Sequence, residues 1–270
     1  MQRANDVAKL LIPECVAFLL KNSHQSHMLL IVIQISMNSP ADTLSIDIGG
    51  TGVKLIVLDS NGLPLCDRQR EVTPQPATPS AVLDVIQALI SKVPKFDRVS
   101  VGFPGVVHDG LVSTAPNLDP EWVGIHLGNQ LRAMMMKPVR VANDADVQGF
   151  GCIQGQGLEM VLTLGTGMGS SLFINGCLVP NLELAHHRFR KGMTYEEYVG
   201  KRALESVGEN KWTKRVLRVI ENTKMVWNWE LMHLGGGNAK LLKTLDLPQN
   251  IKLHSNKAGV LGGYGLWQKS

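Results

Sequence analysis

The feature that most constrains the fold is a pair of short strand-like segments joined by glycines, residues 45–54 with the sequence SIDIGGTGVK. An apolar, β-favouring run at 44–48 precedes the glycines and a second run at 53–58 follows at once, so the segment predicts a β-hairpin. A Walker loop is excluded because no Gly-Lys-Ser/Thr follows, and a dinucleotide fingerprint is excluded because a strand, and not a helix, comes next.

The side chains at this turn fit a phosphate site. Glycine lets backbone N–H groups approach an anion without a Cβ in the way. We therefore expect phosphate contacts from Gly49, Gly50, Thr51 and Lys54. The carboxylate of Asp47 suits Mg²⁺, bound directly or through its water shell. An ordinary glycine-rich hairpin remains the alternative for this decapeptide alone.

Two further glycine clusters follow strand-like runs. The run 161–164 leads into Gly165, Thr166, Gly167 and Gly169, after which 172–174 resumes the strand pattern and Asn175-Gly176 predicts a hairpin turn. Gly235, Gly236 and Gly237 follow the run 231–234 and precede a predicted helix at 239–245. The second cluster matches the chemistry of the first turn, so Gly165, Thr166, Gly167 and Gly169 are also candidates for phosphate contacts. The N–H groups of the third cluster are candidates for a phosphate or nucleoside contact at a helix start.

These turns, with VGFPGVV at 101–107 and LTLGTG at 162–167, resemble the ROK family of sugar kinases in the actin-like ATPase superfamily. Within it the sequence is most similar to polyphosphate glucokinases. The resemblance runs from about residue 44 to the C-terminus. It implies an α/β, two-lobed, ribonuclease H-like fold with a cleft between lobes 44–148 and 149–270. It also implies phosphoryl transfer from polyphosphate, ATP or both to the 6-hydroxyl of glucose, with Mg²⁺. We expect a homodimer.

A candidate base lies in the segment 141–146, VANDAD. Residues 139–141 are strand-like, and Asn143-Asp144 would open a helix at the strand end, where ligands gather in α/β sheets and a carboxylate is favoured. In the resembling kinases Asp144 would take the proton of the sugar 6-hydroxyl, and Asn143 would hold a neighbouring hydroxyl. N-capping alone is the other interpretation of the pair. Asp146 fits a cap or a surface position.

Other sugar contacts are implied by the same resemblance. They are Gly105, Asn117, Glu183, His186 and Glu196. Glu183 and His186 match a family Glu-x-Gly-His element in which Ala185 replaces the glycine. A surface carboxylate is the alternative for Glu183, and a helix-capping glutamate after Thr194 is the alternative for Glu196.

The cysteines depart from the family pattern. Many members carry a cysteine-rich zinc loop after the matching histidine, whereas the cysteines here are Cys15, Cys66, Cys152 and Cys177. None follows His186, so we expect no structural zinc. The scattered cysteines also favour a reducing compartment, and we expect a cytoplasmic enzyme.

Composition fits a globular enzyme without a membrane or nucleic-acid partner. The chain has 270 residues, 44% of them hydrophobic, and a net charge of +4. That charge is concentrated at 186–224, where ten lysines and arginines stand against five glutamates. A track for polyphosphate and a solvated helix face are both open interpretations of this basic segment.

Residues 1–43 do not fit the kinase pattern and are interpreted as a disordered extension or a mis-assigned start. The run at 28–33 is too short for the ~20 residues of a membrane span. Three alternatives remain: an ATP-dependent kinase of another hexose, a non-catalytic sugar sensor, and a structural actin-like module. A repressor-type sensor would need a basic recognition helix that the first 43 residues do not supply. A structural module would not need Asn117, Glu183 and His186.

Overall fold

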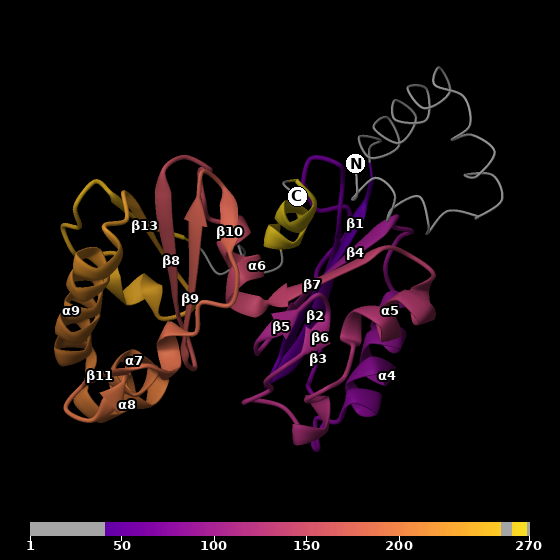
Figure 1. Ribbon diagram of the computed structural model, residues 1–270, viewed down its shortest axis with the longest axis horizontal. Helices are drawn as coiled ribbons and strands as arrows, with labels where there is room; N and C mark the ends of the chain where they lie inside the picture. The colour runs from indigo at the N-terminus through magenta and orange to yellow at the C-terminus, as the bar shows by residue number, and fades with distance from the viewer. Residues whose placement is uncertain (1–40, 255–260, 269–270) are drawn as a thin grey trace, which may run out of the picture. The chain divides into compact units, whose positions relative to one another are not determined.

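The computed structural model describes residues 41–254 and 261–268, and these are built on two five-stranded β-sheets (Figure 1). Almost all of the predicted extension 1–43 lies outside the described residues. When the strands of each sheet are numbered in the order in which they occur along the chain, both sheets have the same spatial order: third, second, first, fourth, fifth. None of the described helices has the length and apolar composition that crossing a membrane requires.

The first sheet has the order β3–β2–β1–β4–β7. Its strands are β1 (Thr43–Gly49), β2 (Gly52–Leu58), β3 (Gln69–Glu71), β4 (Arg98–Phe103) and β7 (Val139–Asn143). β1 pairs antiparallel with β2, which confirms the first predicted hairpin, and parallel with β4. β4 pairs parallel with β7. In this register Asp47 stands opposite Lys54 on one side and Gly102 on the other.

The second sheet has the order β10–β9–β8–β13–β14. Its strands are β8 (Leu158–Leu164), β9 (Met168–Ile174), β10 (Cys177–Val179), β13 (Leu231–Gly235) and β14 (Ile251–Leu253). The predicted hairpin at Asn175-Gly176 is confirmed, with φ of 52° and 76° at the two residues, as a type I′ turn requires. Two small hairpins complete the strands, β5 (Val107–His108) with β6 (Leu111–Val112) and β11 (Arg188–Arg190) with β12 (Met193–Thr194).

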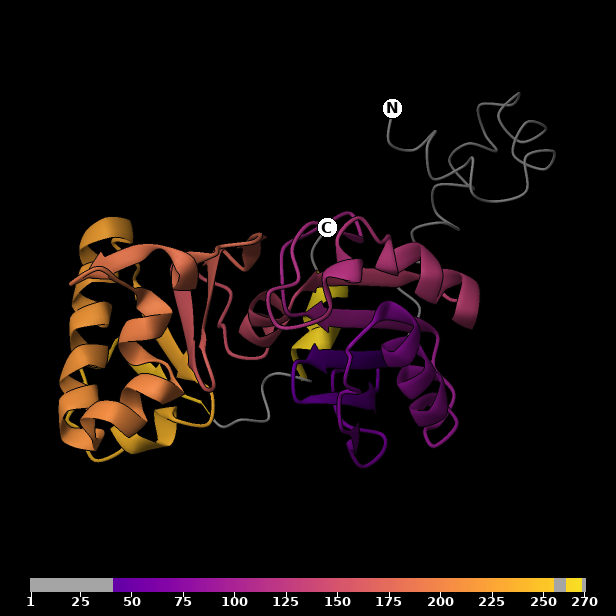
Figure 2. The ribbon, with the colours of Figure 1, turned by 90° about the horizontal axis from the view of Figure 1, so that it is seen from below.

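The helices pack on each sheet and between them. They are α4 (Pro79–Ile90), α5 (Leu127–Met135), α6 (Asp144–Phe150), α7 (Tyr195–Val199), α8 (Lys201–Val207) and α9 (Glu209–Trp227), with the 3₁₀ turns η1 (Pro120–Trp122), η2 (Leu184–His186), η3 (Ala239–Leu242) and η4 (Gly262–Trp267). α6 contacts β4 and β7 of the first sheet and β8 and β9 of the second, and Figures 1 and 2 show it between them. This helix carries the predicted base.

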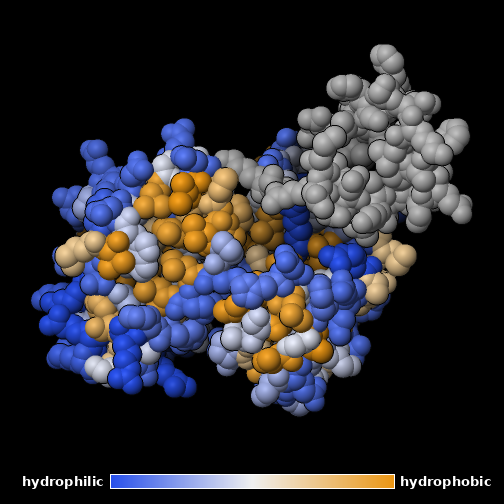
Figure 3. All heavy atoms as spheres, in the orientation of Figure 1, coloured by the Kyte–Doolittle hydropathy of each residue, from blue (hydrophilic) through white to orange (hydrophobic). Residues whose placement is uncertain are grey.

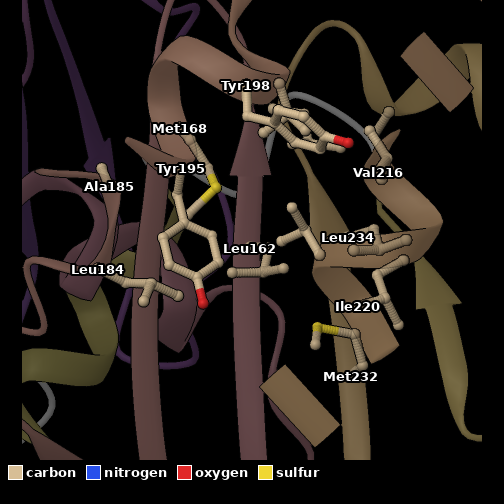
Figure 4. Packing of buried hydrophobic residues seen from close by; sticks show 14 of the residues in the cluster. Leu162, Met168, Leu184, Ala185, Tyr195, Tyr198, Val216, Ile220, Met232 and Leu234 are labelled. Carbon is tan, nitrogen blue, oxygen red and sulfur yellow. The ribbon is translucent and has the colours of Figure 1, made fainter. Parts of the chain in front are cut away.

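Each sheet has its own apolar core. In the first, Leu44, Ile46 and Ile48 of β1 belong to one buried cluster with Val82 and Ile86 of α4. In the second, Leu162 of β8 and Leu234 of β13 pack against Val216 and Ile220 of α9 (Figure 4). α9 forms here because its buried residues recur at helical spacing.

Two C-terminal features differ from the sequence expectation. The helix predicted at 239–245 is wrong, because the structure has only the 3₁₀ turn η3, continued by the i→i+3 bond from Leu245 N–H to Leu242 O. η4 lies within the predicted second lobe, 149–270, yet packs on the first sheet (yellow in Figures 1 and 2). There Tyr264 Oη donates to Ser60 O and Trp267 Nε1 donates to Ser100 Oγ, both at 2.8 Å.

Candidate active site

The predicted base lies where β7 ends and α6 begins. Asn143 caps the helix, because its Oδ1 accepts the N–H of Ala145 at 2.8 Å. Its Nδ2 donates to Gly105 O and to Glu183 Oε1, both at 3.1 Å. The N-capping interpretation is therefore confirmed for Asn143. The same side chain also contacts two residues that the resemblance assigns to the sugar.

The carboxyl of Asp144 has a raised pKa because it is buried close to other carboxylates. Burial raises its pKa to about 7, and the negative charge of Asp47 acts in the same direction. The N–H of Ala145, which donates to Asp144 Oδ1 at 2.8 Å, offsets part of this rise in the pKa, and Glu183 and Asp146 add smaller increases. A base with a pKa near the working pH is suited to general-base catalysis.

The parallel strands bring Asp47 and Asp144 to the same end of the first sheet. Asp47 pairs with Gly102 of β4, and Gly102 pairs with Ala142 of β7. A Cβ added at Gly102 would lie 3.3 Å from the Cα of Asp144. Glycine at 102 therefore leaves room for Asp144 beside β4.

Four of the predicted sugar-contacting residues come together: Gly105, Asn143, Glu183 and His186. Besides the two bonds of Asn143, Glu183 Oε2 lies 3.5 Å from His186 Nε2. Burial raises the pKa of Glu183, whereas His186 lowers it and Glu196 raises it. Glu183 is partly buried in this group, with its side chain 32% exposed, and both of its carboxylate oxygens contact neighbouring side chains. At Gly105 a Cβ would collide with the backbone oxygen of Thr114, so only glycine fits.

The other two predicted sugar residues, Asn117 and Glu196, lie beside the glycine turns. A Cβ at Gly50 would lie 3.0 Å from Asn117 O, and a Cβ at Gly167 would collide with Glu196. Glu196 Oε2 accepts the N–H of Met168 at 3.2 Å.

The capping alternative for Glu196 is wrong. Glu197 forms the capping box with Thr194 at the start of α7, with bonds of 2.7 and 3.1 Å. The reason is spacing, because Glu197 and not Glu196 is three residues after the N-cap.

At the first phosphate turn, Lys54 and Asp47 form an ion pair of 2.7 Å, with side chains 31% and 20% exposed. Thr51 is exposed at the tip of the turn. Both charged groups therefore stand together at the end of β1 and β2, next to the exposed turn where a phosphate is expected.

The second and third turns are joined by Asn238. Its backbone N–H donates to Leu164 O at 2.9 Å, and its Nδ2 donates to Gly165 O at 3.0 Å. Gly236 has φ +84°, and a Cβ there would collide with Leu164. Gly165, in contrast, has nothing within 4 Å of an added Cβ.

Gly169 differs from the other predicted phosphate ligands. Its N–H donates to Thr163 Oγ1 at 3.1 Å, and an added Cβ would lie 2.9 Å from the Cβ of Ala145. Its N–H is thus already bonded, and the glycine lets β9 pack closely beneath α6.

The metal expectations rest on Asp47 and the cysteines. Within 41–254 and 261–268, no three His, Cys, Asp or Glu side chains are grouped to hold a metal ion. Mg²⁺ at phosphate sites needs only one or two carboxylates, with water and phosphate oxygens completing its shell. Asp47, beside the first turn, fits that donor set. Cys66, Cys152 and Cys177 are free thiols, and Cys15 lies outside the described residues.

Sequence reasoning missed the roles of two residues in this region, Asp146 and its hydrogen-bond partner Asn181. The expected cap or surface position of Asp146 is wrong, because it is 1% exposed. Its Oδ2 accepts the N–H of Asn181 at 2.9 Å. One signal was available: the residues three and four positions after Asp146 on the same helix face, Gly149 and Phe150, are small or apolar.

Comparisons with known proteins agree with this geometry. The sequence model of the ROK family matches residues 43–180. A polyphosphate glucokinase of Mycobacterium tuberculosis strain H37Rv is 36% identical over 240 residues, covering 80% of this chain and 88% of that protein.

Solved structures share the fold. The inorganic polyphosphate/ATP-glucomannokinase of Arthrobacter sp. strain KM has a TM-score of 0.75 and 31% identity, covering 84% of this chain and 98% of that one. A ROK family transcriptional regulator, a homologue of the Escherichia coli MLC protein, has a TM-score of 0.64 at 16% identity, covering 84% of this chain and 77% of that one. The chain described here therefore has the actin-like ATPase fold and belongs to the ROK family.

Proposed function

We propose that this protein is a glucokinase that transfers the terminal phosphoryl group of polyphosphate, ATP or both to the 6-hydroxyl of glucose, with Asp144 as general base. The observation that carries the proposal is the carboxyl of Asp144, with a pKa of about 7, next to the Asn143–Glu183 pair. A sensor that only binds sugar needs no such base. The reactions named for the Mycobacterium and Arthrobacter relatives support the choice of substrates.

The proposed sugar site uses Gly105, Asn117, Asn143, Glu183, His186 and Glu196. Glu183 and His186 would bind ring hydroxyls, and Asn143 would hold the hydroxyl next to the reacting one. The contact of Asn143 Nδ2 with Glu183 Oε1, at 3.1 Å, supports this because it fixes both side chains before sugar arrives. Such fixed positions reduce the entropy that must be lost when the reactants are aligned.

In the proposed reaction, Asp144 removes the proton from the 6-hydroxyl as that oxygen bonds to the terminal phosphorus. The bond from this phosphorus to its bridging oxygen breaks, and the leaving group is ADP or a polyphosphate one unit shorter. The backbone N–H groups of the three glycine turns and the cation of Lys54 would hold the phosphates. Mg²⁺, held by Asp47 directly or through water, would neutralise phosphate charge.

The choice of donor depends on the basic segment 186–224. Arg190 of β11 and Arg218 of α9 line one hollow together with Glu221. Figure 3 shows strongly hydrophilic residues over β11 and α8, at the lower left. Arg215 lies over the ring of Tyr198, 4.7 Å from its centroid, and donates to Tyr198 O. Lys211 and Lys214 are exposed on α9, and these lysines are the better candidates for a polyphosphate track.

One assay tests the proposal. Purified protein is supplied with polyphosphate or ATP, crossed with glucose, mannose, fructose and N-acetylglucosamine, and sugar 6-phosphate is measured through a coupled dehydrogenase or by mass. We expect turnover with glucose, dependent on Mg²⁺ or Mn²⁺ and abolished by EDTA. Turnover with another hexose alone would show that this hexose, and not glucose, is the substrate. No turnover with any pair, in protein that binds glucose, would favour a sugar sensor.

A further inference from the structure

The buried carboxyl of Asp146 has no role in the reaction proposed above. It is 1% exposed, and its Oδ1 has no hydrogen-bond partner among the residues that the structure describes. Burial raises the pKa of Asp146 to about 7, the N–H of Asn181 lowers it, and the charge of Glu183 raises it. Burying a carboxyl with an unpartnered oxygen is costly, so packing alone is a poor explanation for this residue.

The partner of Asp146 is an unusual residue itself. Asn181 has φ +58°, the left-handed conformation that asparagine tolerates better than most side chains. While its N–H donates to Asp146 Oδ2, its side chain makes two bonds to the backbone of Val107. Its Oδ1 accepts Val107 N–H at 3.1 Å, and its Nδ2 donates to Val107 O at 3.0 Å.

These bonds connect the two chain segments that supply the proposed sugar contacts. Val107 is two residues after Gly105, and Asn181 is two residues before Glu183. At the other end of the same segments, Gly105 O and Glu183 Oε1 both accept from Asn143 Nδ2. Segments 105–107 and 181–183 are thus held together at one end by Asn143 and at the other by Asn181.

We propose that Asp146 is a positioning residue for the sugar: through Asn181 it fixes the segment 181–183, and so the distance of Glu183 from Asp144. The inference rests on the proposed glucokinase function. It follows from the helix geometry, because Asp144 and Asp146 both belong to α6 and cannot move independently. The base and the support of the sugar-binding glutamate therefore share one rigid element. The charge of Glu183, from segment 181–183, raises the pKa of Asp146, and the charge of Asp146 in turn raises the pKa of Asp144 on the same helix.

The test compares three variants in glucose binding and in steady-state kinetics. Asp146→Ala removes the acceptor for Asn181 N–H, and we expect the KM and the calorimetric Kd for glucose to rise about fivefold or more, the size of a lost hydrogen bond. The KM for the phosphoryl donor should stay within about twofold. Asp146→Asn keeps an acceptor oxygen at this position and should restore glucose affinity to near the wild-type value.

Asn181→Gly separates the two halves of the connection. Glycine adopts the positive φ freely and keeps the N–H that Asp146 accepts, but it loses both bonds to Val107. We expect the same selective loss of glucose affinity. Ser171→Ala is the matched control, because the Ser171 hydroxyl is also buried, unpartnered among the described residues and adjacent to Gly149 of α6. It should leave both constants unchanged.

The outcomes separate this inference from the proposed function. An unchanged glucose affinity in Asp146→Ala would overturn the positioning role. So would an equal loss of affinity for glucose and for the phosphoryl donor. Wild-type protein that binds glucose without phosphorylating it would overturn the glucokinase proposal, while the same Kd comparison still decides the role of Asp146. Wild-type protein that neither binds nor phosphorylates glucose would overturn both.

Discussion

The two glycine hairpins have the same strand pairing but present different chemistry. In the first, Gly49 pairs with Gly52 and a two-residue loop, Gly50-Thr51, joins the strands. In the second, Leu164 pairs with Met168 and the loop has three residues, 165–167. Two positions before the first glycine of each cluster, Gly49 or Gly165, stand Asp47 and Thr163. Asp47 is paired with a lysine, whereas Thr163 accepts the N–H of Gly169.

This difference indicates a division of labour between the sheets. The first sheet supplies charged groups, with Asp47, Lys54 and Asp144 at one end of its strands. The second hairpin supplies backbone N–H groups at its loop, where Met168 N–H donates to Glu196 Oε2 at 3.2 Å. We infer that metal and proton transfer belong to the first sheet and that the second sheet mainly binds phosphate.

The test with the largest expected effect is the substitution Asp144→Asn. It removes the base and keeps the side chain's size, so turnover should fall at least ~10²-fold while glucose binding is largely kept. In the wild type, turnover should rise with pH through about 7 as Asp144 ionises. Near-wild-type turnover would show that Asp144 is not the base, and the exposed Asp84→Asn on α4 serves as control.

The raised pKa of Asp144 also has a consequence for stability. Since the folded pKa lies above the value of 3.8 for the unfolded chain, the native state binds the extra proton between these values. The contribution of this group to the free energy of unfolding is therefore fully present below about pH 4 and is lost as the pH rises through about 7. Asp144→Asn should accordingly raise Tm relative to wild type at pH 8, and the gain should shrink at pH 5.

The second test substitutes the corresponding residue in each of the two hairpins and compares the effects. Asp47→Asn should raise the Mg²⁺ concentration needed for half-maximal turnover roughly 10- to 100-fold, as when a metal's supporting carboxylate is lost. Thr163→Val should leave the Mg²⁺ requirement unchanged. Titration of Mg²⁺ at saturating substrates measures both. Equal effects of the two changes would contradict the division between the sheets.

The third test concerns a buried chain of side chains at the start of the second hairpin. Glu159 lies where the first hairpin has Thr43, and its Oε2 is 2.7 Å from His233 Nε2, while His233 Nδ1 is 2.8 Å from His254 Nε2. Burial acts to raise the pKa of Glu159. Bonds from Gln154, His233, Gly155 and Gln156 outweigh it, so the pKa is lowered from 4.5.

We expect Glu159→Gln to destabilise the protein by about 1–3 kcal/mol at pH 7, the range for bonds to a charged group. Because the folded pKa is depressed, this stability is present above about pH 4.5 and is lost as pH falls through the folded pKa. The difference between the unfolding free energies of the variant and the wild type, measured with denaturant, should therefore become smaller at low pH. A difference independent of pH would show that Glu159 does not act through its charge.

The fourth test compares two glycines of the phosphate turns. At Gly165 an added methyl group meets nothing, so Gly165→Ala should fold normally and raise the KM of the donor a few-fold while the glucose KM stays constant. At Gly236 the positive φ and the contact with Leu164 predict a loss of about 1 kcal/mol or more of stability. Kinetics with thermal unfolding distinguish the two, and an unchanged donor KM in Gly165→Ala would remove this turn from the phosphate site.

The smallest expected effect concerns the donor. Neutralising Lys211 and Lys214 to glutamine should weaken polyphosphate use a few-fold and leave ATP use unchanged, since a long polyanion contacts many cations at once. Polyphosphate turnover should also fall more steeply with KCl, because exposed contacts are screened beyond about 8–10 Å. Activity with ATP alone, at any salt, would make the basic segment a solvated helix face.

Local sequence was enough to predict the strands and turns of both hairpins and the capped start of α6. The reason is that glycine turns, alternating burial and N-cap side chains act over a few residues. The ROK resemblance pointed to Gly105, Asn143, Glu183 and His186, and these residues do lie together. The roles assigned to them remain predictions.

Only the tertiary structure decided which of several similar residues stands at a given place. Residues 144–183 include four acidic residues, Asp144, Asp146, Glu159 and Glu183. The burial of Asp146 beneath segment 181–183 depends on contacts between residues 35 positions apart. The return of η4 to the first sheet, and the meeting of Asn238 with Gly165, depend on separations of 163 and 73 positions. Such contacts follow from packing two sheets around α6, which no short window of sequence records.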